Sequence, residues 1–126
     1  MTVDLTLVAE ASRRSEALWV GVSGGPPRLV WHVWHDGAVC LVGGRGEQEL
    51  PALEDRAVVT VRSRARPTDR VVRFEARVEA VQPGTPAWDQ VTPLLAAARL
   101  NAPDAGSMAE RWAAGGVRVL RLVPDP

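Results

Sequence analysis

The segment Val71–Val81 constrains the fold more than any other part of this 126-residue chain. Two sets of residues alternate through it: Val72, Phe74, Ala76, Val78 and Ala80 on one side, and Val71, Arg73, Glu75, Arg77 and Glu79 on the other. This period of two predicts a β-strand with one buried face and one wet face. Such a strand is typical of an antiparallel sheet.

Five further segments also have the character of strands. They are Ala17–Ser23, Arg28–His35, Ala38–Val42, Ala57–Arg64 and Val117–Val123. Asp36-Gly37 lies between two apolar runs, and this pair predicts a tight hairpin because both residues tolerate a positive φ. The fold class is therefore expected to be mainly β (α+β): a six-stranded antiparallel barrel, closed or split, built as one domain over residues 1–126.

Three or four short helices are expected to flank the barrel. Their signals are Asp4 as a cap at the start of Val3–Ser15, Pro51 in a first turn, Thr85-Pro86 as N-cap and first residue, and Ser107 with capping-box spacing. Pro93 is expected to kink the third of these helices or to restart it, since proline lacks the N–H that a helix interior uses.

Composition limits the classes of function. Fifteen acidic and fifteen basic residues balance, which argues against a nucleic-acid-binding domain. All basic residues are arginine, so chemistry that needs a lysine amine is impossible. The single cysteine, Cys40, cannot form an intrachain disulfide and is expected to be buried. The absence of a leader, and of any apolar run near the roughly 20 residues of a membrane span, predicts a cytoplasmic protein without membrane contact.

The hairpin and the loop after it carry the residue types of a binding site. Trp31, His32, Trp34 and His35 lie on one strand, and Gly43-Gly44-Arg45-Gly46 follows its partner. On a regular strand Trp31 and Trp34 point to opposite faces, and so do the two histidines, whereas His32 shares a face with Trp34. The histidines therefore cannot form a metal site together, and no other zinc-type spacing exists. Either tryptophan could stack on a flat heterocycle or simply pack.

The order of elements resembles the split β-barrel of the pyridoxamine 5′-phosphate oxidase-like superfamily. The most specific part is Leu53-Glu54-Asp55-Arg56-Ala57-Val58-Val59-Thr60-Val61, which is similar to the Leu-x-x-Asp-Pro-x-Val-x-Val-x-Val segment of that superfamily. The resemblance covers about Ala17 to Val123. It implies a homodimer that binds FMN or a deazaflavin in a cleft between subunits and transfers hydride to or from a small substrate.

One departure from the superfamily concerns the cofactor phosphate. Members that hold it commonly carry Ser-x-Lys-x-x-Asn-Leu, and the corresponding residues here are Glu47, Glu49, Ala52 and Leu53. A carboxylate about 5 Å from one phosphate charge, at an effective dielectric constant near 20, costs roughly 3 kcal/mol, or about two decades of affinity. The alternative interpretation of Glu47 and Glu49 is structural, because acidic residues stabilise the start of a helix.

The resemblance then assigns a candidate cofactor site. Its ring pocket comprises Arg28, Trp31, His32 and Trp34; its tail contacts are Gly43, Gly44, Arg45 and Gly46; its anion partners are Arg62 and Arg64. No catalytic residue or metal ligand is assigned. Two alternatives remain: a carrier or interaction module that has lost the cofactor, and a haem-binding split barrel ligated by His32 or His35.

Overall fold

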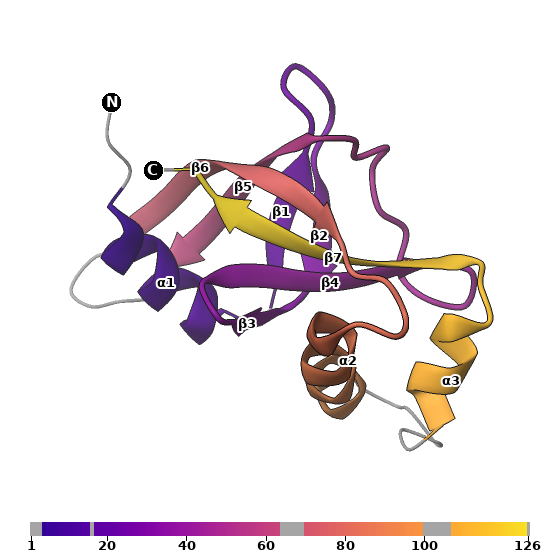
Figure 1. The fold of residues 1–126 in the computed structure, drawn as a ribbon. Helices are drawn as coiled ribbons and strands as arrows, with labels where there is room; N and C mark the ends of the chain where they lie inside the picture. Colours follow the sequence, from indigo (N-terminus) through magenta and orange to yellow (C-terminus); the bar gives the residue numbers. More distant parts are fainter. Residues whose placement is uncertain (1–3, 16, 64–69, 100–106, 126) are drawn as a thin grey trace.

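The computed structural model describes residues 4–15, 17–63, 70–99 and 107–125. In this part the chain forms an antiparallel sheet that curls into a nearly closed barrel, with three helices around it (Figure 1). The strands are β1 (Ala17–Gly21), β2 (Arg28–Trp31), β3 (Val33–His35), β4 (Ala38–Gly44), β5 (Arg56–Ser63), β6 (Arg70–Ala80) and β7 (Val117–Pro124). The helices are α1 (Leu5–Arg14), α2 (Pro86–Ala98) and α3 (Met108–Ala113).

The sheet has seven strands in the described residues, not the six expected, because the predicted strand Arg28–His35 is broken at His32. The strand order is β2-β1-β5-β6-β7-β4-β3. β2 and β3 follow each other in the chain, yet they occupy opposite edges of the sheet, because β2 pairs with β1 and β3 pairs with β4. One regular strand cannot pair with both edges, so the chain changes direction at His32. The two edges meet there and leave the barrel split.

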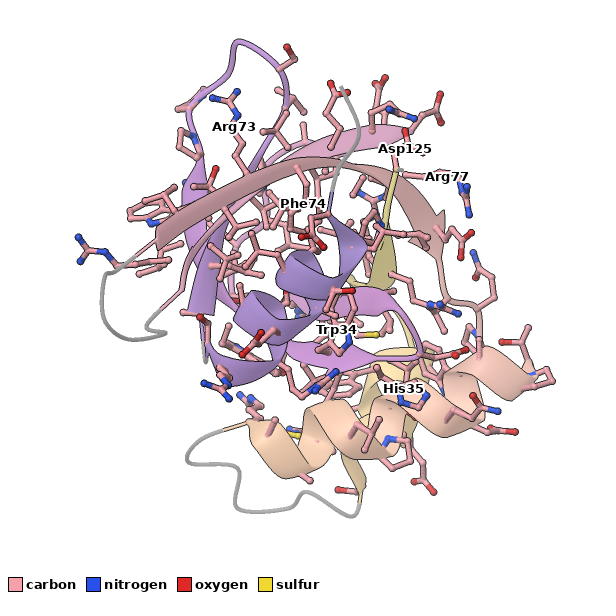
Figure 2. All side chains as sticks on the ribbon, turned by 90° about the vertical axis from the view of Figure 1, so that its left-hand side faces the viewer. Trp34, His35, Arg73, Phe74, Arg77 and Asp125 are labelled. Carbon is pink, nitrogen blue, oxygen red and sulfur yellow. The ribbon has the colours of Figure 1, made fainter. Side chains whose placement is uncertain are left out.

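β6 lies at the centre of the sheet, paired with β5 on one side and β7 on the other. The predicted alternation is confirmed for Val72, Phe74 and Ala76, which are buried while their neighbours are exposed. Phe74 lies on the inner side of β6, and Arg73 and Arg77 lie on its outer side (Figure 2). The pattern weakens toward the end of the strand, where Val78 is half-buried and Ala80 is exposed.

The caps of two helices agree with their sequence signals. The Asp4 carboxylate accepts the N–H groups of Thr6 and Leu7 at 3.1 and 3.2 Å. Thr85 Oγ1 accepts the N–H of Trp88 at 3.2 Å. Helix α2 continues through Pro93 and is not restarted there. Helix α3 begins after Ser107 as expected, although no side-chain capping bond from that serine to the helix forms.

The helix expected around Pro51 does not form, so this prediction is wrong. Residues 45–55 run as turns and irregular chain between β4 and β5. Gln48 hydrogen-bonds through its side chain to two strands, and Leu50 packs on the barrel core. Since both residues hold the segment against the sheet, the chain cannot wind into a helix there.

Two apolar clusters occupy the two faces of the sheet. The larger fills the barrel and includes Leu18, Val59, Phe74 and Leu120, covered at one end by α1. The smaller lies between the outer face of β4 and β7 and the helices α2 and α3, which Figure 1 shows below these strands. Cys40 belongs to this second cluster and is buried as predicted; burial raises the pKa of its thiol to about 11.

The hairpin turn at Asp36-Gly37 is confirmed, with φ of 49° and 74°. A different constraint applies to Gly44 at the end of β4, which has φ of 121°. A Cβ atom there would lie 2.5 Å from the carbonyl oxygen of Gly116 and 2.9 Å from Val117 Cα. Both contacts are backbone atoms that cannot rotate away, so β4 and the start of β7 can approach this closely only at a glycine.

We expect Gly44→Ala to destabilise the protein by about 1–3 kcal/mol from backbone strain, with the backbone overlap adding to this cost. The matched control is Gly46→Ala, because Gly46 also has a positive φ of 79° but has no atom within 4 Å of its would-be Cβ. Urea unfolding followed by circular dichroism measures both variants. Equal losses in the two variants would contradict the close contact with Gly116.

Candidate functional site

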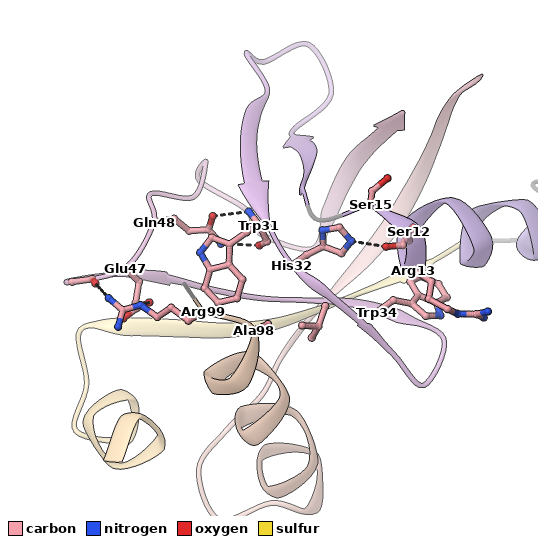
Figure 3. A pocket seen from close by; sticks show the side chains of 12 residues that line it. Ser12, Arg13, Ser15, Trp31, His32, Trp34, Glu47, Gln48, Ala98 and Arg99 are labelled. Carbon is pink, nitrogen blue, oxygen red and sulfur yellow. Dashed lines mark hydrogen bonds and ion pairs between the residues drawn. The ribbon is translucent and has the colours of Figure 1, made fainter. Parts of the chain in front are cut away.

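A pocket of about 670 Å³ opens where the two edges of the sheet meet (Figure 3). Its wall comes from the β2–β3 crossing, the end of α1, the loop after β4 and the end of α2. The lining residues are Ser12, Arg13, Ser15, Trp31, His32, Val33, Trp34, Gly46, Glu47, Gln48, Ala98 and Arg99. Of the ten residues predicted for the site, four lie here: Trp31, His32, Trp34 and Gly46.

Trp31 and Trp34 pack against opposite faces of the sheet, as expected, and yet both line this pocket. Because the chain crosses between the two sheet edges at His32, the pocket borders both faces there. Trp31 packs against the cluster under α2, whereas Trp34 packs against the barrel core. Both indoles are half-buried, so part of each contributes to the pocket wall.

His32 is buried at the break, only 5 % exposed. Its Nε2 lies 2.7 Å from the carbonyl oxygen of Ser12 at the end of α1. Because a carbonyl can only accept, Nε2 carries the hydrogen and Nδ1 of the neutral ring is an acceptor. Burial lowers the pKa of the imidazole, and the bond to Ser12 opposes this only in part. His32 Nδ1 and the Ser12 hydroxyl are both buried without a hydrogen-bond partner in the described structure.

Gln48 joins the two sides of the split barrel. Its Oε1 accepts the N–H of Trp31 at 2.9 Å, and its Nε2 donates to the carbonyls of Trp31 and Val42 at 3.0 and 3.1 Å. Extending the β3–β4 register by two residues would place Trp31 opposite Val42. The Gln48 amide thus stands where the main chains of β2 and β4 would otherwise have paired.

Glu47 and Arg99 form an ion pair at one end of the pocket, with Nε and Oε1 3.1 Å apart. The Glu47 side chain is only 5 % exposed, and its Oε2 also accepts the indole N–H of Trp112 in α3 at 3.3 Å. The interpretation of Glu47 as a helix-start residue is therefore wrong, since no helix begins there. Instead its carboxylate ties the loop after β4 to α2 and α3.

The other residues predicted for the site lie elsewhere. Arg28 pairs with Glu49 at 2.9 Å on the exposed surface, outside the pocket. Gly43 and Gly44 border a separate, more open hollow, where the side chain of Leu50 packs on Gly43 and the backbone of Gly116 packs on Gly44. Arg45 lies along Gly116. Arg62 is exposed and does not line the pocket, although its carbonyl accepts the hydroxyl of Ser15; Arg64 lies outside the described residues.

Sequence reasoning missed the residues that helices contribute to the pocket: Ser12, Arg13, Ser15, Ala98 and Arg99. For the residues from α1, the only signal was the polar Ser12 on the apolar face of that helix. Nothing in the sequence pointed to Arg99. In the described residues no group of three His, Cys, Asp or Glu side chains could hold a metal ion. No helix of the described chain is long and apolar enough to cross a membrane.

Comparison with known proteins gives a clear result for structure alone. No protein-family model and no curated protein matches the sequence. The haem storage protein HutZ of Vibrio cholerae superposes with a TM-score of 0.61 at 13% identity, covering 100% of this chain and 92% of that one. A conserved hypothetical protein of Mycobacterium tuberculosis gives 0.63 at 18% identity, covering 100% and 83%.

An FAD-binding protein of Mesorhizobium loti gives a TM-score of 0.60 at 12% identity, covering 100% of this chain and 91% of that one. The fold is thus the split β-barrel of the pyridoxamine 5′-phosphate oxidase-like proteins, as the resemblance implied. At these identities the likeness establishes the fold and leaves the ligand to be argued from the pocket.

The lowered pKa of His32 predicts how stability depends on pH. The unfolded chain binds a proton at His32 more readily than the folded protein, so stability rises with pH in this window. The stability that the folded protein has while His32 is neutral is fully present above the ordinary pKa of 6.5 and is lost as the pH falls below that value. We expect His32→Gln to flatten the fall in the free energy of unfolding between pH 7 and about 5. Urea titrations at several pH values measure this slope, and identical slopes in both proteins would contradict it.

Proposed function

We propose that the protein is a flavin- or deazaflavin-binding oxidoreductase and that the flat ring of the cofactor binds in the pocket at the split of the barrel. One observation carries the proposal: Trp31, Trp34 and the buried His32 meet in a single pocket of about 670 Å³. The volume lies within the range of about 300–1,000 Å³ that small-molecule sites occupy. The resemblance to split-barrel flavoproteins supports the same ligand class.

The pocket residues fit the ring part of such a cofactor. The two indoles supply apolar surface and faces for stacking. His32 Nδ1 and the Ser12 hydroxyl are buried in the pocket wall without protein partners. A small opening of this wall would let the N–H and C=O groups at the edge of a heterocycle bond to them. A bound flavin or deazaflavin supplies the hydride chemistry itself. The chain would bind the ring, orient its edge and keep water from its face.

The residues do not fit the phosphate of FMN at the position that the resemblance gives it. Gly43 and Gly44 are packed against Leu50 and Gly116, and the N–H groups of Gly44 and Arg45 are bonded within the protein, so the loop offers a phosphate few donors. The buried carboxylate of Glu47 borders the pocket at the same end. We therefore assign the pocket to the ring alone and assign no phosphate contact.

Haem is less well supported, although a haem storage protein shares the fold. A haem iron is commonly held by a histidine nitrogen with a free lone pair. The Nε2 of His32 is engaged with Ser12, and its Nδ1 is enclosed. His35 lies on β3 and does not line the pocket. Iron ligation through Nε2 would therefore require His32 to break its hydrogen bond to Ser12 of α1.

We also propose that the protein is a homodimer joined through the outer face of β2, β1, β5 and β6. Trp19 and Leu29 are direct cross-strand neighbours on this face and are 45% and 57% exposed. The register places Val71, 66% exposed, on the same face. Contiguous exposed apolar residues mark interaction sites. Leu29 and Trp31 point the same way along β2, so a second copy seated here would border the pocket.

We expect riboflavin, FMN, FAD or a 5-deazaflavin to quench tryptophan fluorescence saturably, because Trp31 and Trp34 would stack on the ring. Trp31→Ala should weaken binding of the best ligand by at least about tenfold, or ~1.4 kcal/mol. Leu5→Ala is the control, since Leu5 is exposed on α1 and lies outside the pocket. Binding is measured by equilibrium dialysis as well as fluorescence. Absence of binding to all four ligands would contradict the proposal and favour a carrier or interaction module.

For the dimer, we expect Trp19→Arg together with Leu29→Arg to raise the dimer dissociation constant by 100-fold or more, since two guanidinium groups would be buried without partners. Sedimentation equilibrium measures this. Leu5→Arg is the control, because Leu5 is 47% exposed on α1, away from this face. A monomeric wild-type protein at tens of micromolar would contradict the proposed dimer.

A further inference from the structure

The charged side chains of the pocket are distributed unevenly. Figure 3 shows Glu47 and Arg99 at one end and Arg13 with Trp34 at the other, with Trp31 and His32 between them. Arg13, Glu47 and Arg99 are the charged residues among those that line the pocket. His32 can also ionise, but it is neutral here. The pocket therefore has an end that carries a buried carboxylate, and the nature of the ligand depends on what that end accepts.

Arg99 does not provide a free cation at this end, because each of its nitrogens already has a contact. Nε lies 3.1 Å from the Glu47 carboxylate, one terminal nitrogen donates to the Gly46 carbonyl at 3.3 Å, and the other lies 3.8 Å from Met108 Sδ. The guanidinium thus balances Glu47 and holds the loop. The net charge of the pair is zero, and the Glu47 side chain, which is only 5 % exposed, lines this end of the pocket.

The backbone of the loop does not supply an anion site either. The N–H of Gly44 donates to the Gln48 carbonyl at 3.0 Å, that of Arg45 to Gly116 at 2.8 Å, and that of Glu47 to Gly44 at 2.9 Å. A phosphate is usually held by free N–H groups of such a loop. Here three of them are used within the protein, so a phosphate at this end would meet a carboxylate and few free donors.

We propose that Glu47 is a specificity-determining residue that makes the pocket select a flavin-type ring without a phosphate, of the riboflavin class, over its phosphate ester. This rests on the proposed function, because it assumes that the ring occupies the pocket. An unphosphorylated side chain ends in hydroxyl groups, which can donate to the Glu47 carboxylate. A phosphate instead brings one or two negative charges beside it, and like charges about 5 Å apart repel by an amount equivalent to roughly 100-fold in affinity before Arg99 offsets part of it.

The test compares the dissociation constants of riboflavin and FMN, which differ only in the phosphate, for three proteins. We expect the wild-type protein to bind riboflavin at least about tenfold more tightly than FMN. Glu47→Gln, which keeps the shape and can still accept from Trp112, should bring the two constants to within about threefold. Glu49→Gln is the matched control, since Glu49 is two residues away and pairs with Arg28 outside the pocket; it should keep the wild-type ratio.

A second measurement needs no variant and guards against a Glu47→Gln protein that fails to fold. Raising salt from 50 to 500 mM screens repulsion between charges. The affinity of the wild-type protein for FMN should therefore rise, while that for riboflavin stays constant. FMN binding as tight as riboflavin binding, or FMN binding that Arg13→Gln abolishes, would overturn the selection by Glu47 and leave the ring site intact. Binding of neither compound would overturn the selection by Glu47, and it would overturn the proposed function as well if FAD and a 5-deazaflavin also fail to bind.

Discussion

The crossing of the chain at His32 is the feature on which the rest of the structure depends. Two consecutive strands pair with opposite edges of one sheet, so the barrel can curl shut only if the chain passes from one edge to the other at that residue. The passage leaves the N–H and C=O of Trp31 that point away from β1 without a strand partner. The side chain of Gln48 satisfies both groups and also reaches Val42, with three hydrogen bonds that each contribute about 1 kcal/mol.

The pocket is a direct result of this arrangement. Because Gln48 stands in place of a strand, β2 and β4 separate, and Trp31, His32 and Trp34 line the gap between them. His32 fixes one wall by bonding the end of α1, and Glu47 fixes the other by bonding Arg99 and Trp112. The same contacts that close the barrel therefore position the aromatic and polar groups on which a ring ligand would depend.

Much of this fold was predictable from sequence, because local patterns determined it. The alternation around Phe74, the caps at Asp4 and Thr85, and the turn at Asp36-Gly37 all act between residues close in the chain. The break at His32 was not predictable, since Arg28–His35 reads as one strand and only the pairing of distant strands divides it. The same limit explains the site: Trp31 and His32 were found on the hairpin, whereas the Glu47–Arg99 pair joins residues 52 positions apart with no local signal.

Cys40 has a consequence for how the protein can be studied. It is the only thiol in the chain, it is fully buried under α2 and α3, and burial suppresses its thiolate at neutral pH. An alkylating reagent can therefore reach it only when β4 is transiently uncovered. The rate of labelling at Cys40 Sγ therefore reports how often the layer between the sheet and the helices opens. Any small molecule that holds α2 against the barrel will slow this labelling, even if the molecule is itself colourless, non-fluorescent and chemically unreactive.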